Sequence, residues 1–221
     1  MSQLKQREDS TVHQGKRNFL VEELREKGIT DQRVLDAIKA VPRHFFLDAA
    51  FEHYAYENRT FPIPAGQTIS HPFTVAHQTE LLELKKFDKV LEVGTGSAYQ
   101  ACILAELGVT VYTIERQREL YDHTGKFFLL KKYPNIKRFF GDGYAGLPTY
   151  APFDKIIVTA GAPFVPPNLL AQLKVGGIMV IPVGDDSGQK MLKIVKTAEN
   201  EQELSETGEF AFVPMLEGKS N

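Results

Sequence analysis

The residues best suited to chemistry form one strand, turn, helix and strand in the middle of the chain. An apolar run over residues 89–93 is typical of a short buried strand, and it stops at Gly94, Thr95 and Gly96. Glycines at such a turn leave the main chain and the N–H groups of the following helix open to a ligand. A second apolar run ends at Glu115, where a carboxylate can accept two ribose hydroxyls. This unit predicts a site for an adenosine-containing cofactor, although an ordinary turn of a parallel sheet can carry the same glycines.

Two further acids indicate which cofactor it is. Glu92 stands two residues before the first glycine, as in the Glu/Asp-x-Gly-x-Gly turn of methyltransferases, where the acid lies near the methionine end of S-adenosylmethionine. A nicotinamide pyrophosphate would gain nothing from a carboxylate there. Asp142, followed by Gly143, comes directly after the apolar run 136–140 and can accept a hydrogen bond from an adenine amino group. The pattern therefore favours S-adenosylmethionine over a dinucleotide.

Composition limits the class of protein. A chain of 221 residues with 43% hydrophobic content can bury one α/β domain and little more. Lys and Arg number 26 against 28 Asp and Glu, a net charge of -2 that does not favour nucleic acid as a partner. Cys102, the only cysteine, excludes a disulfide within the chain, and the six histidines show no metal-ligand spacing. No run is long enough to span a membrane. We expect a cytoplasmic monomer without a metal.

The part of the chain before the glycine turn is predicted to be largely helical. Residues 1–12 are polar and expected to be frayed, and an amphipathic pattern predicts a helix over residues 14–27. A second helix follows, capped by Thr30 or Asp31 and stopped by Pro42. These elements form an N-terminal extension beside the cofactor fold.

Residues 54–71 lack periodicity and are expected to form a long loop. Apolar residues within it argue against disorder, so the loop is interpreted as functional. A helix is predicted to start at Pro72. Ser70, just before it, has two interpretations, a plain helix cap or a functional hydroxyl.

Strands and helices alternate from residue 89 to 183. The expected later elements are a helix over 117–132, strands over 136–140, 153–159 and 178–183, and two final strands over 191–196 and 210–214 around an acidic connection at 198–207. This order predicts a doubly wound, mostly parallel α/β sheet of the Rossmann-like kind with a C-terminal strand pair. Because parallel strands end at the same edge, Gly94, Glu115, Asp142 and Thr159 are expected to converge on one crevice. The single domain divides into the extension and substrate loop (13–88), the cofactor-binding core (89–183) and the C-terminal strands (184–221).

With these residues placed, the sequence resembles the protein-L-isoaspartate O-methyltransferase family from about residue 18 to 216. The resemblance rests on the runs at 40–46, 66–70, 91–97, 141–143, 151–154 and 212–214. Gly-Gln-Thr-Ile-Ser at 66–70 is the most specific of them, because general methyltransferases lack it. Three departures are Ala98 for a third turn glycine, Gly161 for an alanine, and Leu216 where some members carry threonine.

The resemblance implies an S-adenosylmethionine-dependent methyltransferase that leaves S-adenosylhomocysteine as product. Its substrates would be peptides and proteins with isoaspartyl residues, which it would methylate on the free α-carboxylate, and the ester would cyclise to a succinimide and start repair. The resemblance also implies that Ser70 is at the active site, that Thr68 and Ile69 line it, and that Val213 and Pro214 border the peptide. The residues expected at the cofactor are Glu92, Gly94, Thr95, Gly96, Glu115, Asp142, Gly143 and Thr159.

The reaction fits the absence of a recognisable catalytic base. An α-carboxylate with a pKa of about 3.5 is already ionised at pH 7, so the protein need only align the reactants, an effect that can contribute ~7–11 kcal/mol. Two alternatives remain open at this point. A methyltransferase of small molecules would have little use for residues 61–71, and a cofactor-binding module without catalysis would lose Ser70.

Overall fold

The buried apolar runs of the sequence form the centre of a seven-stranded sheet. The computed structural model describes residues 8–185 and 187–220. The strand order is β5-β4-β3-β6-β7-β8-β9, with parallel pairing from β5 to β7 and antiparallel pairing beyond it. The strands are β3 (Lys89–Val93), β4 (Thr110–Glu115), β5 (Ile136–Phe140), β6 (Phe153–Val158), β7 (Leu173–Asp185), β8 (Gly188–Ala198) and β9 (Glu201–Phe210).

The sheet reverses its direction of winding between β3 and β6. The chain passes outward from β3 to β4 and β5, then returns to place β6 on the other side of β3. Hydrogen bonds continue past the strand ends there, from Gly94 N–H to the Ile114 carbonyl at 3.0 Å and from Thr159 N–H to the Val93 carbonyl at 3.0 Å. Ligands of open α/β sheets bind at such a point, beyond the carboxyl ends of the strands.

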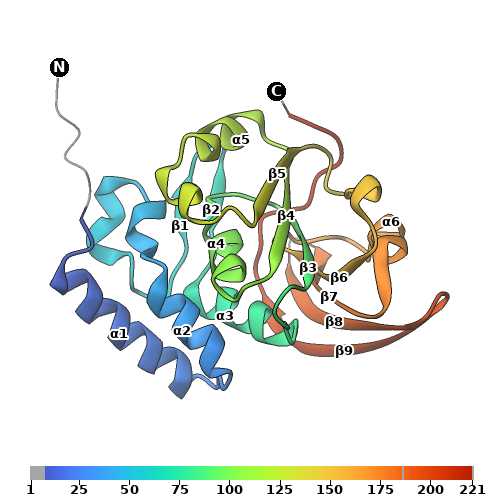
Figure 1. The fold of residues 1–221 in the computed structure, drawn as a ribbon, viewed down its shortest axis with the longest axis horizontal. Coiled ribbons are helices and arrows are strands. Elements are labelled where there is room, and N and C mark those ends of the chain that lie inside the picture. The colour runs from blue at the N-terminus through green and yellow to red at the C-terminus, as the bar shows by residue number, and fades with distance from the viewer. Residues whose placement is uncertain (1–7, 186, 221) are drawn as a thin grey trace.

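The N-terminal helices lie together at one side of the sheet (Figure 1). Ser10 caps α1 by accepting from His13 N–H, and Asp31, one of the two predicted caps, begins α2 by accepting from Arg33 N–H. Apolar residues of both helices share one core with α3 and α4. The helices are α1 (Thr11–Glu26), α2 (Gln32–Ala40), α3 (Pro72–Leu81), α4 (Tyr99–Glu106), α5 (Arg118–Gly125) and α6 (Pro167–Gln172), with short 3-10 turns η1 (Arg43–Phe46), η2 (Ala49–Tyr54), η3 (Phe128–Lys132) and η4 (Pro148–Tyr150). None of the described helices is long and apolar enough to cross a membrane.

Two predictions about local structure need correction. The expected loop at 54–71 contains a hairpin, β1 (Phe61–Ile63) paired with β2 (Gln67–Ile69), whose strands are too short to show a period. The helix predicted over 117–132 ends at Gly125, and η3 follows it. The chain turns there, and Phe127 packs on Phe46 with ring centroids 4.9 Å apart. The expected fraying of residues 1–12 falls partly outside the described residues, and α1 already begins at Thr11.

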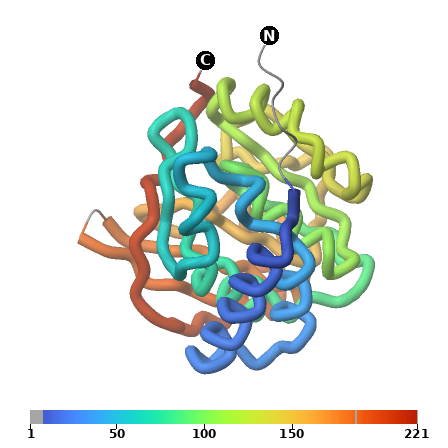
Figure 2. Tube along the Cα trace, turned by 90° about the vertical axis from the view of Figure 1, so that its left-hand side faces the viewer, coloured from blue at the N-terminus to red at the C-terminus, as the bar shows by residue number. Residues whose placement is uncertain are grey.

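The C-terminal strand pair is present, but its second strand was misplaced. The acidic segment expected to be a connection is β9, the edge strand of the sheet, and residues 211–214 lie beyond it. Most of β9 is exposed, so no apolar alternation marks it. Its glutamates are solvated or paired with lysines, as in the 2.9 Å contact between Lys190 and Glu206. Figure 2 shows the segment after β9 (red) passing beside the hairpin region (cyan).

Candidate active site

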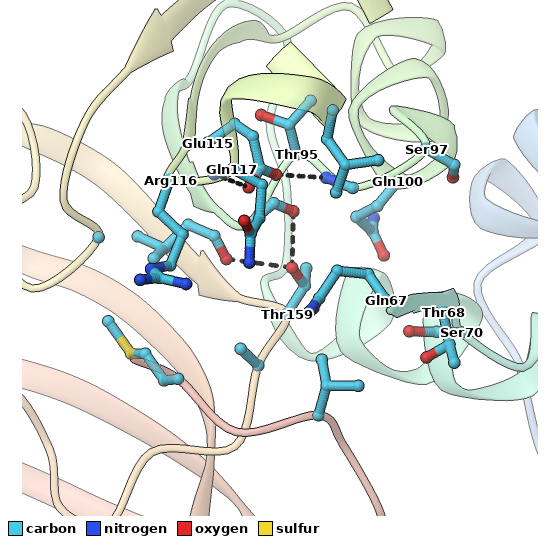
Figure 3. A pocket seen from close by; sticks show the side chains of 18 of the residues that line it. Gln67, Thr68, Ser70, Thr95, Ser97, Gln100, Glu115, Arg116, Gln117 and Thr159 are labelled. Carbon is cyan, nitrogen blue, oxygen red and sulfur yellow. Dashed lines mark hydrogen bonds between the residues drawn. The ribbon is translucent and has the colours of Figure 1, made fainter. Parts of the chain in front are cut away.

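A cavity lies at the carboxyl edge of the sheet, where the winding reverses. One wall, here called the turn side, consists of residues 93–97, 114–117, Leu120 and Gly143. The opposite wall, here called the hairpin side, consists of residues 67–70 and 213–216. Between them lie Val75, Gln78, Tyr99, Gln100, Thr159 and Ala160. Figure 3 shows Thr68 and Ser70 across the cavity from Glu115.

The glycine turn has a backbone that side chains would disturb. Gly94 has φ +101° and Gly96 has φ +52°. The Thr159 hydroxyl donates to the Gly94 carbonyl at 2.7 Å and to the Val93 carbonyl at 3.0 Å, and a Cβ on Gly94 would overlap that hydroxyl. Ala98, which stands where the family often has glycine, has φ +68°. An L-residue at such a φ carries strain of roughly 1–2 kcal/mol, which explains why glycine is common there.

Glu115 is held in place by backbone N–H groups on both sides of its carboxylate. Its Oε2 accepts from Gly96 N–H at 2.9 Å and its Oε1 accepts from Gln117 N–H at 2.8 Å. The residue is only 4% exposed, yet it lines the cavity. Each carboxylate oxygen has a further lone pair, so the group can accept two more hydrogen bonds from a ligand in the cavity. Thr95 supports the same turn, since its hydroxyl lies 2.6 Å from that of Thr113.

Two predicted cofactor residues do not line the cavity. Glu92 is fully buried in β3, and neither of its oxygens makes a hydrogen bond to a residue that the structure describes. Burial raises the pKa of Glu92 to about 8, although the nearby Thr113 hydroxyl opposes this in part. Asp142 accepts from Tyr144 N–H at 2.9 Å, and its neighbour Gly143, rather than Asp142, reaches the cavity. The strand-end pattern placed both acids near the site, but it did not give the direction of their side chains.

On the hairpin side, Ser70 is not a helix cap. His71 holds the N-cap position of α3, and the Ser70 hydroxyl makes no hydrogen bond within the described part of the chain. Ser70 lines the main cavity and also a smaller one beside it, which shares Thr68, Thr159 and Val213 with it. The hydroxyl is therefore available to a ligand from either cavity. The sequence-predicted residues Thr68, Ile69, Val213 and Pro214 also line the main cavity.

The C-terminal segment is fixed to the sheet by main-chain contacts. Gly161 N–H donates to the Val213 carbonyl at 2.8 Å, and Met215 N–H donates to the Gly161 carbonyl at 2.7 Å. Gln189 also accepts from Phe212 N–H at 2.8 Å through its side chain. Residues far apart in the sequence thus complete the wall opposite the glycine turn.

Sequence reasoning missed two amide side chains that α3 and α4 place in the cavity. Gln78 of α3 donates to the Val158 carbonyl at 2.9 Å, and Gln100 of α4 donates to the Thr79 hydroxyl at 2.9 Å. The Gln100 Oε1 is buried without a hydrogen-bond partner among the described residues. The available signal was a polar residue on the buried face of an apolar helix, which does not by itself indicate a ligand. Arg116, Gln117 and Met215 also line the cavity and were not predicted.

Away from the cavity, Asp9, His13 and His44 bring possible metal-ligand atoms within 4.8 Å of one another. The sequence showed no such spacing. The Asp9 carboxylate already pairs with Arg17 at 2.8 Å, and the two histidine rings are stacked with centroids 3.9 Å apart. An arginine in contact with the carboxylate disfavours a second cation, so the cluster is interpreted as structural.

Comparison with known proteins identifies the family. Residues 15–220 match the family model described as protein-L-isoaspartate(D-aspartate) O-methyltransferase. The chain belongs to this family. Relatives named protein-L-isoaspartate O-methyltransferase from Flavobacterium johnsoniae and Christiangramia forsetii are 56% and 57% identical to it, over 96% of this chain and 99% of each relative.

Solved structures agree on the fold. A structure named protein-L-isoaspartate O-methyltransferase matches with a TM-score of 0.81 at 27% identity, covering 90% of this chain and 65% of that one. A Plasmodium falciparum protein, described as a putative member in complex with S-adenosyl-L-homocysteine, matches with a TM-score of 0.79 at 24% identity, covering 90% and 98%. The predicted methyltransferase fold and family are confirmed. The family model and the relatives also confirm the S-adenosylmethionine-dependent activity, methyl transfer to isoaspartyl residues of proteins.

Proposed function

We propose that S-adenosylmethionine binds along the turn side of the cavity and that Ser70 orients the isoaspartyl α-carboxylate from the hairpin side. The observation that carries this division of roles is the Ser70 hydroxyl, which lines the cavity without a hydrogen bond to any described residue. The walls also differ in chemistry. The turn side offers a fixed carboxylate and main-chain groups, whereas the hairpin side offers hydroxyls and apolar surface.

The proposed cofactor contacts follow from this geometry. Glu115 would accept the two ribose hydroxyls, and the backbone at Gly94, Thr95 and Gly96 would lie against the methionine portion. Gly143 would border the adenine. Thr159 would hold the turn through its bonds to the Val93 and Gly94 carbonyls.

Glu92 and Asp142 would support these cofactor contacts without touching the cofactor themselves. Glu92 lies in β3 directly before the turn, and Asp142 fixes the loop at Gly143 through Tyr144 N–H. Both acids would therefore support the cofactor site indirectly, which replaces the direct contacts expected from the sequence.

The proposed chemistry requires alignment and no proton transfer. When bound, the cofactor supplies the methyl carbon and a sulfonium that departs as neutral S-adenosylhomocysteine. The substrate carboxylate is ionised at neutral pH, so Ser70 would donate one hydrogen bond to it and leave its other oxygen toward the methyl group. Thr68 and Ile69, with Val213 and Pro214 opposite, would hold the peptide on both sides of that carboxylate. The methyl ester would then cyclise to a succinimide without further help from the protein.

We also propose that the protein acts as a cytoplasmic monomer on isoaspartyl peptides and proteins. The free edge of the sheet supports the monomer. Exposed glutamates, among them Glu203, Glu206 and Glu209, lie along β9. Like charges on an edge strand oppose pairing with the edge of a second copy.

The test uses one hexapeptide in its isoaspartyl and normal aspartyl forms, with Ser70→Ala and the wild type. The wild type should methylate the isoaspartyl form and refuse the other, since displacement of the carboxylate by about 1 Å can cost roughly 100-fold in rate. Ser70→Ala should lower the rate without altering its pH dependence near neutrality, because Ser70 would titrate no proton in the reaction. Release of labelled methanol from the labile ester measures the methylation of each peptide form and the rate of each protein.

Ser205→Ala is the matched control, because Ser205 is exposed on β9 and does not line the cavity. It should retain the wild-type rate. A wild-type rate in Ser70→Ala, or loss of a titration step in that variant, would contradict the proposed role of Ser70.

A further inference from the structure

Arg43 is a buried arginine of the N-terminal extension that does not line the cavity but contacts the backbone of Ser70. It is 0% exposed and begins η1. Its Nε donates to the Ala55 carbonyl at 3.1 Å, and its Nη2 donates to the Ser70 carbonyl at 2.8 Å and to the Arg59 carbonyl at 3.3 Å. One guanidinium therefore joins three segments of the chain, and one of these segments carries Ser70.

The positive charge of Arg43 has no anionic partner among the residues that the structure describes. Its neighbours are carbonyl oxygens and the ring of Tyr99, whose centroid lies 5.0 Å from Cζ, while Nη1 makes no hydrogen bond there. Burial lowers the pKa of Arg43 to about 10, against the opposing influence of Tyr99 and Tyr56, so the group stays protonated at neutral pH. A buried cation without a counter-ion is costly, and an anionic ligand held at the nearby Ser70 would offset part of that cost without touching the guanidinium.

We propose that Arg43 is a positioning residue for methyl transfer, which fixes Ser70 through its carbonyl and supplies the positive charge that favours the substrate α-carboxylate beside Ser70. This inference rests on the proposed function of Ser70. The guanidinium touches the backbone of the residue whose hydroxyl would hold the carboxylate. A carboxylate at that hydroxyl would feel the charge through protein rather than through water, where the interaction would be several-fold weaker.

The indirect contact suits the way charge changes during the reaction. Carboxylate and sulfonium neutralise each other as the methyl group moves from sulfur to oxygen. A cation paired directly with the carboxylate would therefore stabilise the reactants more than the transition state. Arg43 instead contacts the Ser70 carbonyl. Its charge should act mainly on peptide binding, and its hydrogen bond should act mainly on the alignment of Ser70.

The test compares two peptides that differ only in charge. One carries the isoaspartyl α-carboxylate, and the other carries the neutral α-carboxamide at the same position. Calorimetry on the protein saturated with S-adenosylhomocysteine gives the ratio of their affinities. Arg43→Met should lower this ratio by about 10-fold or more, because the charge is lost. Arg43→Lys should keep the ratio within about threefold but lower kcat by about 10-fold, because one ammonium cannot reach all three carbonyls.

Arg17→Met is the matched control. Arg17 is also buried, at 6% exposure, but it pairs with Asp9 and donates to the Tyr56 hydroxyl at 3.0 Å, without a contact to Ser70. This variant can lose stability as Arg43→Met does, yet its peptide affinity ratio and its affinity for S-adenosylhomocysteine should match those of the wild type.

An unchanged affinity ratio in Arg43→Met would overturn the charge role, and a wild-type kcat in Arg43→Lys would overturn the positioning role. If Arg43→Met does not fold, Arg43→Gln takes its place in the affinity measurement, because this variant also removes the charge, and Arg43→Lys still decides the positioning role. The rate of Ser70→Ala separates a failure of this inference from a failure of the proposed role of Ser70, on which the inference rests. A wild-type rate in Ser70→Ala refutes the role of Ser70, whereas a slow Ser70→Ala with an unchanged ratio in Arg43→Met refutes only the role of Arg43.

Discussion

The two walls of the cavity are built in different ways. The turn side comes mostly from one strand, turn and helix unit and its neighbouring strand, joined by main-chain bonds such as Gly94 N–H to the Ile114 carbonyl. The hairpin side combines residues 67–70 with residues 213–216, which lie more than half the chain apart. Arg43 from the N-terminal extension supports it. One wall is thus a local structure, and the other exists only after the chain has folded.

The buried ionisable groups behind the two walls also differ in type and in charge. Beneath the turn side lies Glu92, an acid whose pKa burial raises to about 8. Behind the hairpin side lies Arg43, which remains a cation. In the proposed function, the wall that receives the cationic sulfonium lies over an uncharged acid, and the wall that receives the carboxylate lies over a cation. Changes on the two sides should therefore separate cofactor binding from peptide binding.

The largest effect is expected at the glycine turn. Gly94→Ala should weaken S-adenosylhomocysteine binding by roughly 2–5 kcal/mol, because φ is +101° and the new Cβ would overlap the Thr159 hydroxyl. Calorimetry measures the loss. Gly15→Ala is the control, since no atom lies within 4 Å of a Cβ in that helix, and it should stabilise the protein by about 0.5–1 kcal/mol. Near-normal affinity in Gly94→Ala would show that the turn is not the rigid wall described above.

The next effect concerns pH and stability. In the folded protein the pKa of Glu92 is about 8, above its ordinary value of 4.5, so the native state keeps a proton that the unfolded chain releases. This contribution to stability is complete below about pH 4.5 and is lost as the pH rises to about 8. Glu92→Gln removes the titration. Its stability relative to the wild type should rise by roughly 1–4 kcal/mol between pH 5 and pH 8 in urea denaturation. A constant difference across that range would contradict a protonated Glu92.

A moderate effect should be confined to cofactor binding. Glu115→Ala removes charge-assisted hydrogen bonds and should weaken S-adenosylhomocysteine binding by ~1–3 kcal/mol. Peptide affinity of the cofactor-saturated variant should change little, because Glu115 belongs to the opposite wall. Equal cofactor affinity of variant and wild type in calorimetry would show that Glu115 does not contact the cofactor. A comparable loss in peptide affinity would break the separation between the two walls.

The smallest effect is expected at the rim of the hairpin side. Leu216 lines the cavity but is 48% exposed. Leu216→Thr should therefore change the peptide KM by less than about threefold, since a half-exposed side chain loses little buried apolar area on substitution. Steady-state kinetics with an isoaspartyl peptide measures this. A change of 10-fold or more would mean that the peptide covers Leu216 when it binds.

Much of the turn side could be predicted because its signals are local. Continuous apolar runs mark β3, β4 and β6, and paired glycines mark the turn that follows β3. Glu115 was placed at a strand end, and the structure puts it in the cavity. The pattern failed for Glu92 because a run of buried residues on a two-sided sheet does not show which face a side chain takes.

The hairpin side was harder to predict for a physical reason. Each of its strands has only three residues, and β9 is an exposed edge whose charged residues carry no apolar period. Ser70 was singled out through a family run, but its availability became evident only once His71 held the cap position of α3.

The sequence by itself determined the parallel strands of the core, the glycine turn and the family, because their apolar runs and motifs consist of residues adjacent in the chain. The tertiary structure alone decided that residues 213–216 face Ser70 and that Arg43 lies behind it, 27 positions away along the chain. The acceptors of a buried guanidinium are the carbonyl groups that lie near it in the folded chain. Their positions depend on tertiary packing, so residue spacing in the sequence does not predict them.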